Sequence, residues 1–268
     1  MSRSPLHVKP RARTGLVHDI TPASAGWTHV GFALHRLSAG EGAEGETGER
    51  EVCLVLVAGK ARVTVDGVEF GELGDRMSPF EGAPYAVYVP KGSHWHVVAT
   101  TALELGVCSA PGGEGFKAQV IAPGRHPQMT RGKDTNTRYV TNIMPEDDGA
   151  AQSLLVVEVI TPGGHTSSYP PHKHDQDALP AESLLEETYY HRLDPAQGFV
   201  MQRVYTDDRS LDETIAAEDG DVVLVPKGYH PVAAIHGYQS YYLNVMAGPQ
   251  RVWKFHNAPE HAWLFTGV

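Results

Sequence analysis

The chain has 268 residues, of which 41% are hydrophobic and 20% charged, and its formal net charge is −10 at pH 7. These proportions are ordinary for a globular protein, which argues against disorder. No apolar run reaches the roughly 18 residues of a membrane helix, and the basic N-terminus lacks the apolar stretch of a secretory signal. The acidic balance argues against nucleic-acid phosphates as partners. Because Cys53 and Cys108 allow at most one disulfide, the sequence predicts a cytoplasmic protein with both thiols buried.

Short strand-like segments follow one another along the chain. Residues 51–67, EVCLVLVAGKARVTVDG, have alternating apolar positions, β-branched residues and an Asp-Gly turn, which together predict strand, turn and strand. The same texture recurs at 85–92, 102–111, 153–164, 198–208, 221–228 and 240–248. Helical periodicity is confined to 180–190, with a possible start at Pro180, and to 210–219. The pattern predicts a mainly β protein.

An internal repeat predicts two similar domains. VYVPKGSHWHV (87–97) and VLVPKGYHPVA (223–233) share Val-x-Val-Pro-Lys-Gly-x-His about half a chain length apart. LHRLSAGEG (34–42) and VEVITPGGH (157–165) match at a similar offset. We therefore expect two tandem β-barrels related by duplication, covering residues 1–122 and 123–268.

A cluster of potential metal ligands lies in the second half. Along a strand, side chains alternate between faces, so His172 and His174 of YPPHKHD point the same way. Two imidazoles on one face suit a metal ion, and a third imidazole, His230, follows the PKG turn of the repeat. The carboxylate is Glu186 or Glu187. A strand favours Glu187, because Tyr189 and His191 then share its face in a polar pocket, whereas a helix at 180–190 would remove that reason.

The order His-x-His, Glu, Pro-x-Gly-x-His resembles the two short motifs of the cupin superfamily, whose small jelly-roll barrels hold a metal through three His and one Glu. YPPHKHD, the stretch from LEETYYHRLDPAQGF to VVLVPKGYHPV, and YYLNVMAGP more specifically resemble the 5-deoxy-glucuronate isomerase family of bacterial myo-inositol catabolism. Twelve residues separate His174 from Glu187, more than in most cupins, and only Tyr229 separates Gly228 from His230.

The resemblance implies a mainly β bicupin that binds one divalent metal per chain, zinc or manganese, through His172, His174, Glu187 and His230. It implies conversion of a sugar acid, 5-deoxy-D-glucuronate, to 2-deoxy-5-keto-D-gluconate. The first barrel has GEGAEGETGEREV (40–52) where a His-x-His would stand, so we expect it to lack a metal.

The sequence leaves the proton-transferring group open. Glu186, Asp175, His191 and Tyr242 are candidates for the general base. Tyr242 alternates with Asn244 and would face the barrel interior with it, unless Tyr241, Leu243 and Val245 face inward instead.

For the substrate carboxylate, Arg203 in GFVMQRVY and Lys227 in VPKGYH are candidate cations. An iron-dependent bicupin dioxygenase and a non-catalytic sugar-binding cupin are the competing functions. A homo-oligomer is left open as an alternative to a single chain.

Overall fold

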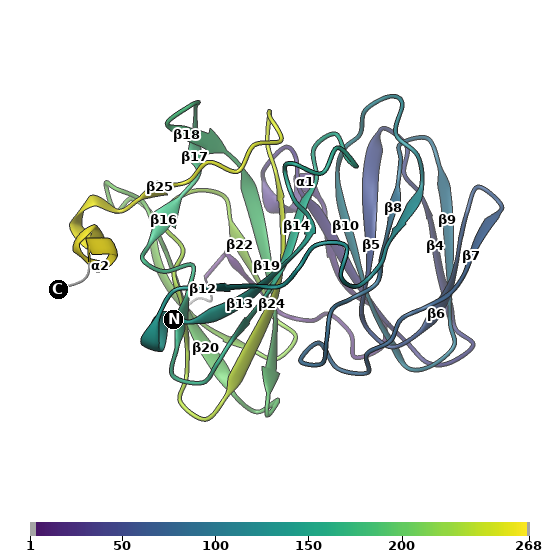
Figure 1. Cartoon of the computed structure of the whole chain (residues 1–268), viewed down its shortest axis with the longest axis horizontal. Coiled ribbons are helices and arrows are strands. Elements are labelled where there is room, and N and C mark those ends of the chain that lie inside the picture. Colours follow the sequence, from purple (N-terminus) through teal and green to yellow (C-terminus); the bar gives the residue numbers. More distant parts are fainter. Residues whose placement is uncertain (1–3, 267–268) are drawn as a thin grey trace. The chain divides into compact units, whose positions relative to one another are not determined.

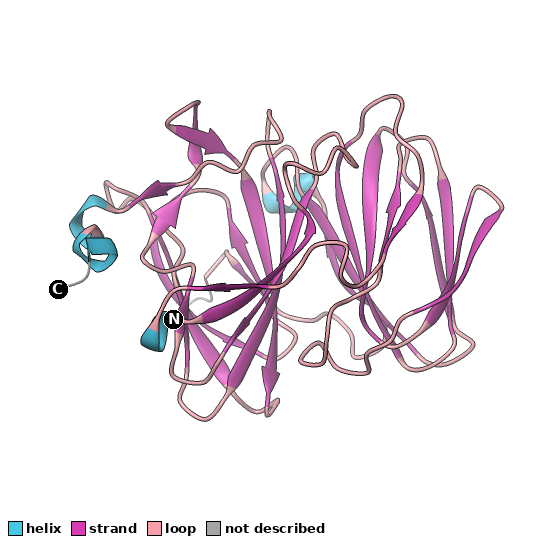
Figure 2. Ribbon diagram, viewed as in Figure 1, coloured by secondary structure: helices cyan, strands magenta, loops and turns pink. Residues whose placement is uncertain are grey.

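The computed structural model describes residues 4–266, and its regular structure is almost entirely β (Figures 1 and 2). The helical pieces are one turn or little more: α1 (Pro22–Ala25), η1 (Asp134–Asn136), η2 (Pro259–His261) and α2 (Trp263–Thr266). None of the helices in the described part of the chain has the length and apolar character needed to cross a membrane. The predicted mainly β class is confirmed.

The chain forms two compact units. The N-terminal unit contains Pro10–Pro127 and Thr141–Val157, and the C-terminal unit contains the residues up to Lys9, Gln128–Val140 and the residues from Glu158 onward. Each unit is therefore discontinuous in sequence, and the tandem division into 1–122 and 123–268 stays a prediction about where one barrel ends.

The N-terminal unit holds two antiparallel sheets, one of six strands in the order β11-β8-β5-β10-β3-β2 and one of four in the order β4-β9-β6-β7. Their bounds are β2 (Gly15–Ile20), β3 (Gly31–Leu37), β4 (Gly42–Glu46), β5 (Arg50–Ala58), β6 (Ala61–Val65), β7 (Val68–Leu73), β8 (Ala86–Val89), β9 (His94–Ala99), β10 (Leu103–Pro111) and β11 (Gln119–Ile121). Seventeen buried side chains, mostly Val, Leu and Ala from these strands, form its core. Cys53 and Cys108 lie opposite each other on β5 and β10, and both are free thiols with no exposed surface.

The C-terminal unit holds most of the remaining strands, whereas β13 and β14 each have residues in both units. A seven-stranded sheet has the order β1-β22-β19-β24-β14-β13-β12, and a four-stranded sheet has the order β15-β23-β20-β21. The pairs β16-β25 and β17-β18 add two short ribbons. The bounds are β1 (His7–Val8), β12 (Met129–Arg131), β13 (Arg138–Met144), β14 (Leu155–Thr161), β15 (Thr166–Ser167), β16 (His172–Lys173), β17 (Asp175–Ala178), β18 (Glu182–Leu184), β19 (Glu186–Asp194), β20 (Phe199–Tyr205), β21 (Asp212–Glu218), β22 (Val222–Val225), β23 (Val232–Ala234), β24 (Gln239–Ala247) and β25 (His256–Asn257).

The strand orders show the internal duplication. In the large sheets, β8-β5-β10-β3 of one unit corresponds to β22-β19-β24-β14 of the other, and the two four-stranded sheets also correspond strand by strand. The repeated Val-Pro-Lys-Gly follows β8 in one unit and β22 in the other. The sequence repeat is therefore a repeat of structure.

The two predicted helices are wrong. Residues 182–194 form β18 and β19, and residues 212–218 form β21, which pairs with β20 over its whole length. In β21 only alternate residues, such as Ile215 and Ala217, are buried, which is the period of a strand packed on one face. The tertiary partner outweighs the weak local helix propensity of SLDETIAAED.

Candidate metal centre

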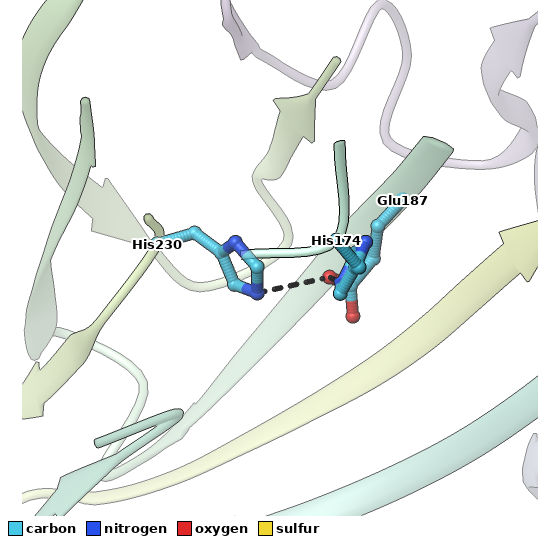
Figure 3. A group of neighbouring side chains, drawn as sticks. All are labelled: His174, Glu187 and His230. Carbon is cyan, nitrogen blue, oxygen red and sulfur yellow. Dashed lines mark hydrogen bonds and ion pairs between the residues drawn. The ribbon is translucent and has the colours of Figure 1, made fainter. Parts of the chain in front are cut away.

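Three buried side chains converge inside the C-terminal unit (Figure 3). His174 follows β16, Glu187 lies on β19, and His230 lies in the turn after β22. Each offers one ligand atom, and these atoms all lie within 4.8 Å of one another. The three side chains are at most 2% exposed. This group could hold a metal ion.

The hydrogen bonds of the two imidazoles fix the positions of their protons. Nδ1 of His174 donates to the carbonyl oxygen of Leu185 at 3.0 Å, and Nδ1 of His230 donates to the carbonyl oxygen of Gly228 at 2.9 Å. Each Nε2 of a neutral ring then carries a lone pair, and the two lie 3.2 and 3.3 Å from the same Oε2 of Glu187.

The Nε2 atom of His230 is buried and has no partner in hydrogen-bonding geometry. Lone pairs that face one another with no proton between them repel, and a cation among them removes that repulsion. Bonds from Nδ1–H to backbone carbonyls are also the outer contacts that metal-binding histidines usually make. The donor set of His174, Glu187 and His230 therefore fits a metal ion.

His172 lies beside this group and is partly exposed. Its ring centroid is 4.9 Å from that of His230 and 6.3 Å from that of His174, and the carbonyl of Pro170 accepts a hydrogen bond from it. It is outside the set whose donor atoms all lie within 4.8 Å. The structure thus brings the four predicted ligands together, three of them tightly and the fourth as a close neighbour.

Burial and charge keep two of the histidines neutral. Burial and the neighbouring His174 lower the pKa of His172 to about 3, and burial lowers the pKa of His230 to about 3 in spite of the nearby Glu187. Burial also acts to lower the pKa of His174, but the hydrogen bond and charge of Glu187 outweigh it, so that this pKa is raised. A metal binds only the neutral imidazole, and the lowered pKa values of His172 and His230 keep both of these rings in that form.

Asp175 connects the two segments that carry the histidines. Its Oδ1 accepts from Nζ of Lys173 at 2.6 Å and from the side chain of Gln176 at 3.0 Å, while its Oδ2 accepts from the backbone N–H of Gly228 at 2.9 Å. The carbonyl of that same Gly228 holds His230. Asp175, a predicted candidate base, therefore holds the turn that carries His230 in place.

Gly228 is required in that turn. Its φ is +90°, in the left-handed region, and a Cβ at this position would collide with the carbonyl oxygen of Tyr205. Tyr205 and Tyr229 also exchange backbone hydrogen bonds of 2.9 and 2.8 Å across the turn. These contacts present His230 toward Glu187.

A cavity opens beside this group of side chains, and both His172 and Glu187 line it. Ser168, which has a φ of +47°, places its Oγ 2.9 Å from the hydroxyl of Tyr189 and 3.4 Å from that of Tyr242. Burial raises the pKa of both phenols, so they are neutral proton donors. The cavity is lined by polar residues and by an apolar wall: Arg131, Arg138, Ser168, His172, Glu187, Tyr189, Tyr242, Asn244, Asn257, Trp253, Phe255 and Phe265 among them.

Two of the proposed acid–base residues are not in this cavity. Tyr242 lines it together with Asn244, as the alternation along β24 predicts. Glu186 alternates with Glu187 on β19 and does not line the cavity. His191 shares the face of Glu187 but has no exposed surface, and its Nε2 is 2.9 Å from the side-chain oxygen of Gln202. Neither Glu186 nor His191 lines the cavity, and a catalytic role for either stays a prediction.

Both predicted carboxylate-binding cations also lie elsewhere. Arg203 points outward from β20, is 45% exposed and forms two hydrogen bonds of 2.7 Å to Asp212. On β20 it is Gln202 that faces inward, so the period of the strand turns Arg203 away. Lys227 is exposed in the turn before His230 and does not line the cavity.

The cavity instead contains two arginines that the sequence reasoning missed. Arg131 ends β12 and Arg138 begins β13, and the two are directly paired across this hairpin. Neither arginine was among the predicted cations, because the Gly, Asp and Asn residues of TRGKDTNTRYV indicate a turn. Its two arginines, placed on either side of one turn with strand residues outside them, were the available signal for a hairpin.

Comparison with known proteins places the fold and the family. An IolB-like protein from Salmonella typhimurium LT2, known from a crystal structure, superimposes with a TM-score of 0.95 at 52% identity, over 97% of this chain and 99% of the other. Bacillus subtilis oxalate decarboxylase superimposes with a TM-score of 0.64 at 14% identity, over 96% of this chain and 80% of the other, which is a likeness of fold alone. The chain is thus a bicupin, two β-barrels of cupin type, with a His/Glu group in the C-terminal unit that could hold a metal ion.

The model of the KduI/IolB family matches residues 6–264, so the chain belongs to this family. A relative named 5-deoxy-glucuronate isomerase, from Geobacillus kaustophilus, is 54% identical over 251 residues, which are 93% of this chain and 91% of the relative. A relative of the same name from Listeria innocua is 47% identical over 264 residues, 98% of this chain and 97% of the relative.

Proposed function

We propose that this chain is an aldose–ketose isomerase that converts 5-deoxy-D-glucuronate into 2-deoxy-5-keto-D-gluconate in myo-inositol degradation. The observation that carries the proposal is identity of 47 to 54% along nearly the whole chain to relatives named 5-deoxy-glucuronate isomerase. The cavity beside the buried His/Glu group could bind the substrate of such a reaction.

We propose His172, His174, Glu187 and His230 as ligands of one divalent metal ion. Three neutral imidazoles and one carboxylate leave the ion with net positive charge, and zinc and manganese both accept such ligands. When bound, a divalent ion polarises a carbonyl and stabilises negative charge that develops on oxygen, an effect of several kcal/mol.

The remaining groups of the cavity suit proton transfer. An aldose becomes a ketose when a proton leaves one carbon, a proton reaches its neighbour, and the intervening oxygens carry charge in between. Tyr189 and Tyr242 hold their protons because burial raises their pKa values, so each can donate a hydrogen bond to such an oxygen. Of the two, Tyr242 is the residue already predicted as catalytic, and Ser168 orients its hydroxyl.

The test is turnover of 5-deoxy-D-glucuronate without oxygen. Protein stripped of metal with a chelator is assayed alone and with zinc, manganese or iron(II) added back. His174→Ala removes a ligand, and His94→Ala is the matched control, because His94 is an exposed histidine of the N-terminal unit. We expect metal-dependent conversion in the wild type and in the control, and none in His174→Ala.

Failure of every metal to restore conversion would refute the isomerase, and a requirement for oxygen would point to the dioxygenase. Conversion by His174→Ala at the wild-type rate, after a metal is added back, would refute the proposed ligand set. Residence in the cytoplasm and assembly into a homo-oligomer stay predictions, which fractionation of cells and light scattering would check.

A further inference from the structure

The two arginines of the β12–β13 hairpin form an unusual pair. Arg131 and Arg138 are cross-strand neighbours, and like charges directly opposite each other destabilise a sheet. Both residues line the same cavity as Glu187 and Tyr242. Two cations are thus held together at the wall of the cavity that also contains the proposed metal ligands.

Their charge is not compensated by the protein. Within residues 4–266, neither Arg131 nor Arg138 forms an ion pair with a carboxylate, and the side chain of Arg138 donates to the carbonyl of Asn136 at 3.1 Å. Other arginines of the same unit have such partners: Arg192 with Asp219 at 2.7 Å, Arg203 with Asp212 at 2.7 Å, and Arg209 with Glu260 at 3.8 Å. Burial, together with the repulsion of Arg131, lowers the pKa of Arg138 despite an opposing effect of Tyr242. A guanidinium stays charged in proteins, so an anion between these two groups would relieve a real repulsion.

The hairpin is shaped to hold this pair. Gly132 has a φ of +77°, and a Cβ there would collide with the carbonyl oxygen of Asn136 and lie 2.7 Å from Nη1 of Arg138. The side chain of Asn136 donates to the carbonyl of Tyr169 at 3.0 Å and accepts from Thr166 at 3.1 Å. These bonds tie the turn to the chain segment that leads to His172, so the arginines are positioned before any ligand arrives.

We propose that Arg131 and Arg138 bind the carboxylate of the substrate and make the enzyme selective for aldoses that carry a terminal acid group. This inference rests on the proposed isomerase function. In the open-chain substrate the aldehyde and the carboxylate are at opposite ends of the carbon chain, so one cavity lined by metal ligands and by an arginine pair recognises both ends. The planar guanidinium suits a carboxylate because it donates two parallel hydrogen bonds.

The test compares 5-deoxy-D-glucuronate with its amide, which has nearly the same shape and no charge. Wild type, Arg131→Gln, Arg138→Gln, Arg138→Lys and the matched control Arg203→Gln are assayed with both compounds, and metal content is measured in each. We expect the wild type to prefer the acid by on the order of 10- to 100-fold in kcat/KM, since hydrogen bonds to charged groups are strong. The Gln variants should lose most of this preference, chiefly through KM, with unchanged metal content. The preference of Arg138→Lys for the acid should lie between those of the wild type and Arg138→Gln, and the preference of Arg203→Gln should equal that of the wild type.

A wild-type preference for the acid that survives in both Gln variants would overturn the arginine pair and leave the isomerase intact. Absence of turnover of the acid by the metal-loaded wild type would instead overturn the proposed function. Should Arg138→Gln fail to fold, Arg131→Gln decides, because the Arg131 side chain forms no hydrogen bond within residues 4–266. Calorimetric titration of metal-stripped protein with the acid gives a second readout that does not depend on turnover. Equal affinity of the wild type and Arg131→Gln would count against the pair.

Discussion

Asp175→Ala tests how the ligand-bearing turn is held. The Asp175 side chain is 8% exposed and bridges Lys173 to the backbone N–H of Gly228, whose carbonyl orients His230. Alanine removes the acceptor for that N–H and the carboxylate closest to the ammonium group of Lys173, at 2.6 Å. The substitution should therefore lower both the free energy of unfolding and the affinity for a metal ion.

The size of each effect follows from the contacts that remain. Breaking a buried ion pair by removing one partner costs about 3–5 kcal/mol, but Lys173 keeps Glu182 and Asp207, each at 3.5 Å. We therefore expect a loss of about 2–3 kcal/mol in the free energy of unfolding. Loss of an outer contact of a metal ligand typically lowers metal affinity by about 10- to 100-fold, and the same range is expected for zinc here.

Urea unfolding gives the first quantity, and competition with a chromogenic zinc chelator gives the second. Asp175→Asn keeps an oxygen that can accept from Gly228 but lacks the charge, so it should recover most of the zinc affinity and less of the stability. Asp177→Ala is the matched control, because Asp177 is an exposed residue of the same strand, β17. Zinc affinity of Asp175→Ala within twofold of the wild type would refute the positioning role.

Three further predictions concern the cavity and the cores. Tyr242→Phe should lower kcat by on the order of 100-fold or more with unchanged metal content, as expected for an acid–base group, and a kcat within threefold of the wild type would contradict this. Burial lowers the pKa of His191 to about 4 in spite of its hydrogen bond to Gln202. An unfolded histidine takes up its proton near pH 6.5, so this group favours folding above pH 6.5, and its contribution is lost as the pH falls toward 4. Between pH 7 and 4, the free energy of unfolding of metal-stripped His191→Asn should therefore fall by about 3 kcal/mol less than that of the metal-stripped wild type. Parallel curves of this free energy against pH would contradict the prediction. Burial raises the pKa values of the Cys53 and Cys108 thiols, so a thiol reagent at pH 8 should label the native protein slowly and both sites quickly in denaturant, whereas fast native labelling would argue for an accessible thiol.

The strands and the duplication could be predicted because they depend on local patterns. Short apolar runs rich in Val, Leu and Tyr mark β5 and β24, and the repeated Val-Pro-Lys-Gly marks the same position in both units. The proximity of His174, Glu187 and His230 was also predictable, because a recognisable motif gives the order of the ligands. These features need no knowledge of which strand lies next to which.

Which side chains face the cavity and which face solvent depends on the pairing of strands that are distant in the sequence. Arg203 and Arg131 both stand at polar positions of short strands, and the sequence alone does not say that the first faces solvent and the second a cavity. That difference comes from the partners β21 and β13. For the same reason His191 shares a strand face with Glu187, yet it packs against Tyr189 and Tyr242 and does not line the cavity.

The pairing of β1 with β22 has a consequence for the order of folding during synthesis. His7 contacts Asp221, which is translated 214 residues later, and Lys9 contacts the same carboxylate at 2.7 Å. Nearly all of the N-terminal unit leaves the ribosome in between, so that unit can fold while the first strand of the other still lacks its partner. Since closing so long a loop is slow, the large sheet of the C-terminal unit is completed late. An exposed strand edge at β22 is the expected weak point of the nascent protein.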